Sequence, residues 1–452
     1  MTTSDKTATE KLSTFVTEFE GSRIPPEAIH EAKRAIIGFL GCAVAGSRDP
    51  AWAAASKATL ELYPQGAASV IGLETQLPLP EAVFLNAAAS NVLDFDDTHS
   101  ETIIHPTAPV VPVLLGIAEH QAIQGRTLLD ATVLAFEVMC RIGIAAGPGH
   151  YKGGWHITAT CGVFGAATAA SLVRGASSRQ LADALGIAAG QGAMLLTNLA
   201  EMAKFVGVGN AARNGCLAAH YAHNGMTASR DALEGRFGFF EVMGMGEPRL
   251  SALDGLGTPW EINRNMHKPY PVGVVLNSVI TACLRLRETP GFSVGQIRQI
   301  RVAGHPLLVD RTDRASVCSI ADARLSTQHT AAVTLLRGEP ELQCFVPEAF
   351  ENAEVRELAR KVTVTAREGI EVSGVELTII RDGGEPIRIA VNDAKGSLNN
   401  PMSDDELVEK TIRLCQHGAP GCDPSLVIDA IWALEKTDDA GSILGGWRAA
   451  RR

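Results

Sequence analysis

The sequence predicts a mainly helical protein with two domains, a large all-helical domain interrupted by a smaller α+β domain. Before about residue 265, apolar residues recur at helical spacing with almost no strand signal. Runs of alternating apolar residues, which indicate strands, are confined to the region that follows. Helical spacing returns beyond Pro401. We therefore predict a discontinuous helical domain of residues 1–267 and 399–452 and an α+β domain of residues 268–398.

In the first part of the chain, each predicted helix has an apolar face or an end signal. Pro25 and Pro26 stand where a helix can begin, and Ser177 with Gln180 forms a capping box. Helices are predicted over about residues 11–20, 26–46, 81–92, 113–123, 127–144, 157–173, 181–189 and 211–224. The glycine-rich stretch 149–156 is expected to be a loop, and Lys204 is expected to lie ahead of the last of these helices.

The α+β part contains a hairpin signal. Residues 375, 377 and 379 are apolar and alternate with other residues, residues 382–385 can turn, and residues 387, 389 and 391 alternate back. Further strands are predicted around residues 300–302 and 362–364, and helices over about residues 274–287 and 323–336. Helices are predicted again from residue 403 and over residues 424–436.

Composition excludes several classes of function. The net charge is −10 and there is no basic tract, so nucleic acid is not an expected partner. The nine cysteines are odd in number and form no C-x-x-C, which predicts free thiols in a reducing cytoplasm. The polar start predicts no signal peptide. The longest uncharged run, Ile157–Val173, is short for a membrane span, so no membrane partner is expected.

The stretch from Asn91 to Pro112 combines charge with apolar residues. It holds four acidic residues and two histidines within twelve positions, interspersed with large apolar side chains. Buried carboxylates and imidazoles are costly unless paired, so such a cluster is a candidate chemical site. The alternative is an acidic loop at a helix end, broken by Pro106 and Pro109.

Five residues at element boundaries are candidates for the chemistry: Asp94, Thr98, His105, His156 and Lys204. A histidine at a helix start can act as acid or base, and a lysine in apolar surroundings can hold a carboxylate. A metal site is an alternative, built from Asp94, Asp96, Asp97, His99 and His105. No recognised metal spacing occurs and no G-x-G-x-x-G follows a strand, so we expect neither a metal nor a nucleotide cofactor.

The order of these motifs resembles the MmgE/PrpD family, which contains 2-methylcitrate dehydratase, cis-aconitate decarboxylase and iminodisuccinate epimerase. The matching motifs are Asp94-Phe95-Asp96-Asp97-Thr98, His105-Pro106, His156 before a Gly/Ala helix, Lys204 followed by Gly209-Asn210-Ala211-Ala212, and Lys268-Pro269-Tyr270-Pro271. The resemblance implies a cofactor-free, metal-free homodimer with a helical domain, an α+β lid domain and an active site between them. It also implies that the five candidates above are site positions.

Two positions depart from the family pattern. Asn277 stands where the dehydratases and decarboxylases carry a histidine, and His329 stands where they carry a tyrosine. A dehydratase or decarboxylase needs an acid there, whereas an epimerase needs only one acid and one base flanking a carbon beside a carboxylate.

We therefore predict an enzyme that removes a proton alpha to a carboxylate of a small di- or tricarboxylate, with an epimerase resembling iminodisuccinate epimerase as the first choice. A lyase resembling 2-methylcitrate dehydratase or cis-aconitate decarboxylase is the alternative, and a non-catalytic carboxylate-binding protein is the alternative of another class. The predicted catalytic residues are His105, His156, Lys204 and Asp94, and the predicted substrate-binding residues are Thr98, Arg213, Lys268, Asn277 and His329.

Overall fold

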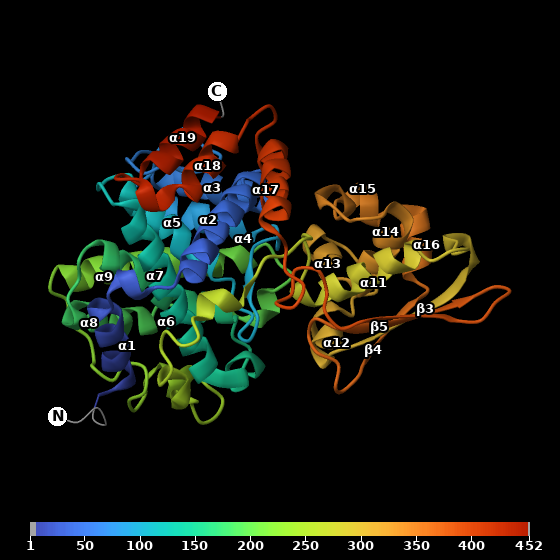
Figure 1. Cartoon of the computed structure of the whole chain (residues 1–452), viewed down its shortest axis with the longest axis horizontal. Coiled ribbons are helices and arrows are strands. Elements are labelled where there is room, and N and C mark those ends of the chain that lie inside the picture. The colour runs from blue at the N-terminus through green and yellow to red at the C-terminus, as the bar shows by residue number, and fades with distance from the viewer. Residues whose placement is uncertain (1–5, 451–452) are drawn as a thin grey trace. The chain divides into compact units, whose positions relative to one another are not determined.

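The four-stranded sheet is confined to one part of the computed structural model (Figure 1), which describes the backbone of residues 6–450 and the side chains of residues 6–447. One unit comprises Met1–Asn265 and Asp404–Arg452, and the other comprises Met266–Ser403. The first unit is almost wholly helical, and the second combines helices with a four-stranded sheet. The predicted fold class, a large helical part with a smaller α+β part, is confirmed.

The helical unit is built around α7. Its principal helices are α1 (Ala8–Glu18), α2 (Pro26–Gly46), α3 (Pro50–Leu62), α4 (Leu79–Asn91), α5 (Thr107–Ala118), α6 (Gly125–Lys152), α7 (Ile157–Val173), α8 (Ser178–Ala189), α9 (Lys204–His223), α10 (Phe239–Met243), α17 (Asp404–Gly418), α18 (Ser425–Trp432) and α19 (Ser442–Ala450). Small residues let neighbours approach α7 closely. A Cβ at Gly162 would lie 2.9 Å from Pro109 of α5, and a Cβ at Gly215 of α9 would lie 2.4 Å from the carbonyl oxygen of Val163.

Three predicted helix boundaries differ most from the structure. α5 begins at Thr107, before Pro109 and Pro112, because first-turn amides need no partner within the helix and only Pro112 removes a helical hydrogen bond. α6 resumes after a break at Gly147 (φ 69°, ψ 179°) and includes residues 149–152, which were expected to be loop. α9 begins at Lys204 itself, seven residues earlier than predicted, so that Lys204 stands at a helix start.

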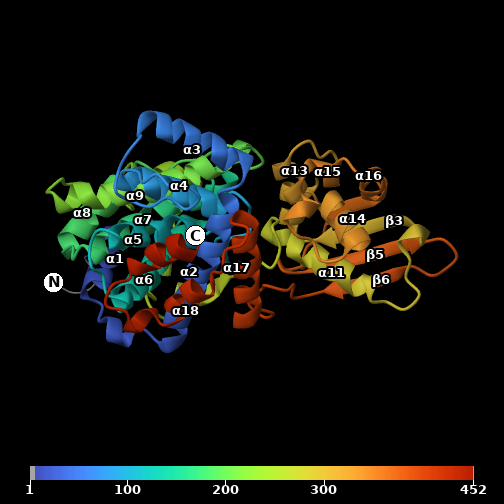
Figure 2. The same cartoon turned by 90° about the horizontal axis from the view of Figure 1, so that it is seen from above.

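The α+β unit contains a mixed sheet of order β4-β3-β5-β6. The strands are β3 (Ile297–Gly304), β4 (Val362–Ala366), β5 (Val375–Arg381) and β6 (Ile387–Val391), and the helices are α11 (Asn277–Arg287), α12 (Pro306–Thr312), α13 (Ile320–Arg324), α14 (Thr327–Arg337), α15 (Pro347–Phe350) and α16 (Ala353–Ala359). The predicted hairpin is β5–β6, with Leu377 opposite Ile389. β3 runs parallel to β4 and antiparallel to β5. Helices α11 and α14 cover one face of this sheet (Figure 2).

None of the nine cysteines forms a disulfide, and all but Cys318 are buried. Within residues 6–450, no helix is both long enough and apolar enough to cross a membrane.

Candidate functional site

The acidic stretch forms a tight turn immediately after α4. We call residues 94–97 the acidic turn. Asp94 has a φ of 56°, a left-handed conformation that aspartate tolerates better than most residues, and its N–H donates to the carbonyl of Asn91. Asp94, Asp96 and Asp97 are all buried. The chain continues into β1 (Thr98–His99), which pairs with β2 (Asn265–Met266). The acidic turn is therefore part of the buried framework and not a solvated loop.

His105 returns beside the acidic turn through a short loop. Its Nδ1 lies 2.9 Å from the carbonyl oxygen of Asp97, 3.3 Å from Thr98 Oγ1 and 3.5 Å from Asp96 Oδ1. A carbonyl can only accept, so these contacts assign the proton of the neutral ring to Nδ1. The lone pair is then on Nε2, which is the nitrogen able to take a proton from a bound molecule.

Lys204 contacts the first residue of the acidic turn. Its Nζ is 2.9 Å from Asp94 Oδ2, and both side chains are about nine-tenths buried. Because the ion pair is shielded from water, it holds the ammonium in one place more firmly than a surface pair would. The start of α9 thus brings a fixed positive charge next to the acidic turn.

His156 joins the cluster from the N-terminus of α7. Its ring lies nearly parallel to that of His105, with centroids 6.5 Å apart and an interplanar angle of 13°. Its backbone N–H donates to the carbonyl of Met194, and the N–H of His105 donates to Thr158 Oγ1 in the first turn of α7. The structure thereby brings together Asp94, Thr98, His105, His156 and Lys204, which the sequence analysis selected separately.

Two asparagines that the sequence analysis did not select hold the remaining carboxylates. Asn91 Nδ2 donates to Asp96 Oδ2 over 2.8 Å, and Asn265 Nδ2 donates to Asp97 Oδ2 over 2.6 Å. In the part of the chain that the structure describes, the Oδ1 atoms of both asparagines are buried without a hydrogen-bond partner. A buried acceptor of this kind is a place where a ligand or a water can donate. Asn91 begins the acidic stretch, but no local signal distinguishes Asn265.

His99, one of the possible metal ligands, belongs to a buried charge network. Its Nδ1 lies 2.8 Å from Thr102 Oγ1 and its Nε2 lies 2.9 Å from Glu261 Oε2. Glu261 also pairs with Arg141, which pairs in turn with Glu137. Burial favours the neutral carboxyl of Glu261, but its pKa is lowered because the hydrogen bond and charge of His99 and the charges of two arginines outweigh burial. Both nitrogens of His99 are therefore engaged in structure.

Arg213 does not join the cluster. It lies nine residues after Lys204 on α9, which is about two and a half turns and places it on the opposite face of the helix. Its guanidinium lies 3.4 Å from Glu81 and over the ring of Phe84. Arg213 does not share a helix face with Lys204, because the spacing that aligns side chains on a helix is three or four residues. Its role in binding substrate stays a prediction.

The other predicted binding residues belong to the α+β unit. Lys268 is 1% exposed. Asn277 opens α11, and its buried Oδ1 finds no hydrogen-bond partner among the residues described. His329 lies in the core of this unit, where its Nε2 is 2.7 Å from the carbonyl oxygen of Cys344 and its ring packs edge-on against Phe345 and Phe350. Burial lowers the pKa of His329, which favours the neutral ring.

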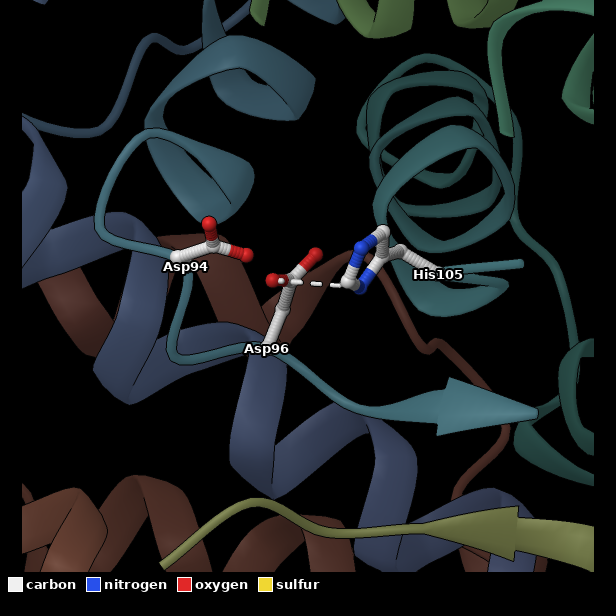
Figure 3. Close-up of side chains that lie close together, drawn as sticks. All are labelled: Asp94, Asp96 and His105. Atoms are coloured by element: carbon white, nitrogen blue, oxygen red, sulfur yellow. Dashed lines mark ion pairs between the residues drawn. The ribbon is translucent and has the colours of Figure 1, made fainter. Parts of the chain in front are cut away.

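Asp94, Asp96 and His105 also form a possible donor set for a metal. Their side chains point toward one another (Figure 3), and one ligand atom from each lies within 4.8 Å of the others. Carboxylate oxygens with an imidazole nitrogen suit several divalent cations. The ammonium of Lys204 already supplies positive charge beside Asp94. The arrangement chemically fits a site that attracts an anion to Lys204 and exchanges protons through two imidazoles.

Comparison with known proteins identifies the family of this chain. Residues 10–251 match the MmgE/PrpD N-terminal domain, and residues 270–434 match the MmgE/PrpD C-terminal domain. A cis-aconitate decarboxylase of Aspergillus terreus is 28% identical over 96% of this chain and 95% of its own length. The cis-aconitate decarboxylase-like protein oryM of Aspergillus oryzae is 26% identical over 98% of each chain. The human cis-aconitate decarboxylase is 26% identical over 90% of this chain and 87% of its own length. The chain therefore belongs to the MmgE/PrpD family.

Proposed function

We propose that this protein is a cofactor-independent lyase that decarboxylates a small unsaturated tricarboxylate of the cis-aconitate type. The observation that carries the proposal is the buried cluster in which the Lys204–Asp94 ion pair stands beside the two stacked imidazoles of His105 and His156. The full-length similarity to decarboxylases supports the lyase, which the sequence analysis held as its alternative, over the epimerase.

The roles of the residues follow from their contacts. Lys204 holds a substrate carboxylate or stabilises negative charge as it develops, because a buried ammonium is worth more to an anion than a hydrated one. When the carbon–carbon bond to the departing carboxylate breaks, carbon dioxide leaves. The electron pair of that bond stays on the substrate carbon. An imidazolium, from His105 or His156, then donates the proton that forms the new carbon–hydrogen bond.

An epimerase remains the second candidate because the two residues of the α+β unit that depart from the family pattern offer no acid. Asn277 carries no acid, and the ring of His329 is bound in the core. An amide can hydrogen-bond a carboxylate but cannot supply a proton at neutral pH. Chemistry confined to the two histidines of the helical unit would suffice for epimerisation.

One experiment in heavy water separates these functions. The protein is incubated with cis-aconitate, 2-methylcitrate and iminodisuccinate, while proton NMR and released carbon dioxide are followed. We expect stoichiometric carbon dioxide from cis-aconitate and one solvent deuteron in the product. Deuterium exchange with inversion of iminodisuccinate and no carbon dioxide would favour the epimerase, and alkene formation from 2-methylcitrate would favour a dehydratase. Binding without any turnover or exchange would indicate a carboxylate-binding protein.

We expect activity to be independent of bound metal. Lys204 supplies the positive charge that a Lewis acid would otherwise provide at Asp94. After dialysis against EDTA, kcat and KM should stay within about twofold of their starting values, a change too small to represent the loss of a catalytic charge. Metal analysis of the same sample is the control. Stoichiometric metal whose removal abolishes activity and whose return restores it would instead assign Asp94, Asp96 and His105 as ligands.

We further propose that the protein is a homodimer. Six large hydrophobic side chains are exposed between residues 202 and 245 of the helical unit: Met202, Tyr221, Met226, Phe237, Val242 and Met245. We propose that these side chains contribute to the contact between the two copies, because exposed apolar surface is a feature of protein–protein interfaces. Sedimentation equilibrium should give twice the chain mass of 47.7 kDa. A mass of one chain across the micromolar range would refute the dimer.

A further inference from the structure

A buried lysine from the C-terminal part of the chain reaches the acidic turn. Lys410 lies on α17, is 2% exposed, and donates from Nζ to the carbonyl oxygen of Phe95 over 2.7 Å. The same ammonium lies 4.1 Å from the centroid of the Phe95 ring. The contact joins residues 315 positions apart in the sequence.

The ammonium of Lys410 lies next to a turn that is rich in buried aspartates. Phe95 lies between Asp94 and Asp96, and three of the four residues of the acidic turn are buried aspartates. Carboxylates so close together repel one another in a medium of low dielectric constant. A buried lysine is costly by itself, but next to this turn its charge offsets that repulsion.

The helix that carries Lys410, α17, packs closely against α2. Thr411, the neighbour of Lys410, donates from Oγ1 to the carbonyl of Ile37 on α2. At Gly41 of α2, an added Cβ would lie 3.0 Å from the Cα of Thr411, so the two helices are in close contact. The lysine thus projects from a helix fixed against the core, and its ammonium can hold the turn in one position.

The acidic turn contacts two residues of the proposed site, Lys204 and His105. Asp94 pairs with Lys204, and the carbonyl of Asp97 orients the ring of His105. We propose that Lys410 is a positioning residue, whose ammonium locks the acidic turn through the Phe95 carbonyl so that Lys204 and His105 are correctly placed. The inference deepens the proposed function and rests on it for its kinetic readout.

The test compares Lys410→Met with Lys33→Met as a matched control. Lys33 is also a buried lysine of the helical unit that donates to a backbone carbonyl, that of Trp432, and it pairs with Glu435. Both variants should lose stability. Only Lys410→Met should lower kcat/KM on cis-aconitate, by about tenfold to a hundredfold, because small misplacements of catalytic groups have effects of that size. Lys410→Arg, which keeps the charge and the donor, should recover part of this loss.

A second readout does not depend on the substrate. The Nδ1 proton of His105, hydrogen-bonded to Asp97, should give a downfield proton resonance in water, assigned by its absence in His105→Gln. We expect this resonance to be lost or shifted in Lys410→Met, or in the milder Lys410→Gln if the methionine variant does not fold, and unchanged in Lys33→Met.

The outcomes separate the two proposals. An unchanged His105 resonance in the Lys410 variants, with kinetics equal to those of Lys33→Met, would show that Lys410 only stabilises the fold and would overturn the inference. A changed resonance in a protein whose wild-type form does not act on cis-aconitate would support positioning by Lys410 and reject the proposed substrate.

Discussion

Replacing Lys204 by methionine should lower kcat on the true substrate by about a hundredfold or more, the usual effect of removing a charge that stabilises a transition state. The same change leaves the nine-tenths-buried carboxylate of Asp94 without its ion pair, so the free energy of unfolding should fall by about 3–5 kcal/mol. Steady-state kinetics and urea unfolding measure the two effects separately.

A double-mutant cycle with Asp94→Asn tests the physical reason. Because the second substitution removes the uncompensated charge, the variant carrying Asp94→Asn and Lys204→Met should be more stable than Lys204→Met alone, yet no more active. Recovery of activity in the double variant would mean that Lys204 serves only to neutralise Asp94. Additive losses of stability would mean that the two side chains are not coupled.

Replacing His105 by glutamine should lower kcat by about 100- to 10,000-fold with a much smaller change in KM, because the ring is expected to act in proton transfer and not in binding the ground state. Glutamine can keep a hydrogen bond to the Asp97 carbonyl, so the acidic turn should remain in place. His156→Gln should show a loss of similar size, since the two rings face each other.

His220→Gln is the matched control for both histidine variants. His220 lies on α9 of the same unit, and its Nδ1 is 2.8 Å from the carbonyl oxygen of Cys216. Its substitution should leave kcat within about twofold, as expected for a residue outside the proton-transfer path. Wild-type kcat in both His105→Gln and His156→Gln, with correct folding shown by circular dichroism, would remove proton transfer from the assigned roles.

Elements whose signals are local were predicted well. The helix Ile157–Val173 was predicted with the bounds it has in the structure, and the capping box at Ser177 is present. The β5–β6 hairpin was predicted from alternation and a turn. Periodicity and caps act within a few residues, so they can be read without knowing the fold. The predicted starts of α5 and α9 were wrong because prolines and glycines were taken to lie outside these helices. The free-energy cost of such a residue in a helix depends on its position within the helix.

The sequence by itself determined the fold class. It also selected Asp94, Thr98, His105, His156 and Lys204, since a motif names residue types in a fixed order, and the structure brings these side chains together. Only the tertiary structure decided how these side chains are supported. It brought Asn265 to Asp97 and Lys410 to Phe95, and it assigned Arg213 to Glu81 and His329 to the core of the α+β unit. These pairings join residues far apart in the chain, or depend on which face of a helix a residue occupies. They arise because buried charges and amides must find partners wherever packing brings them together.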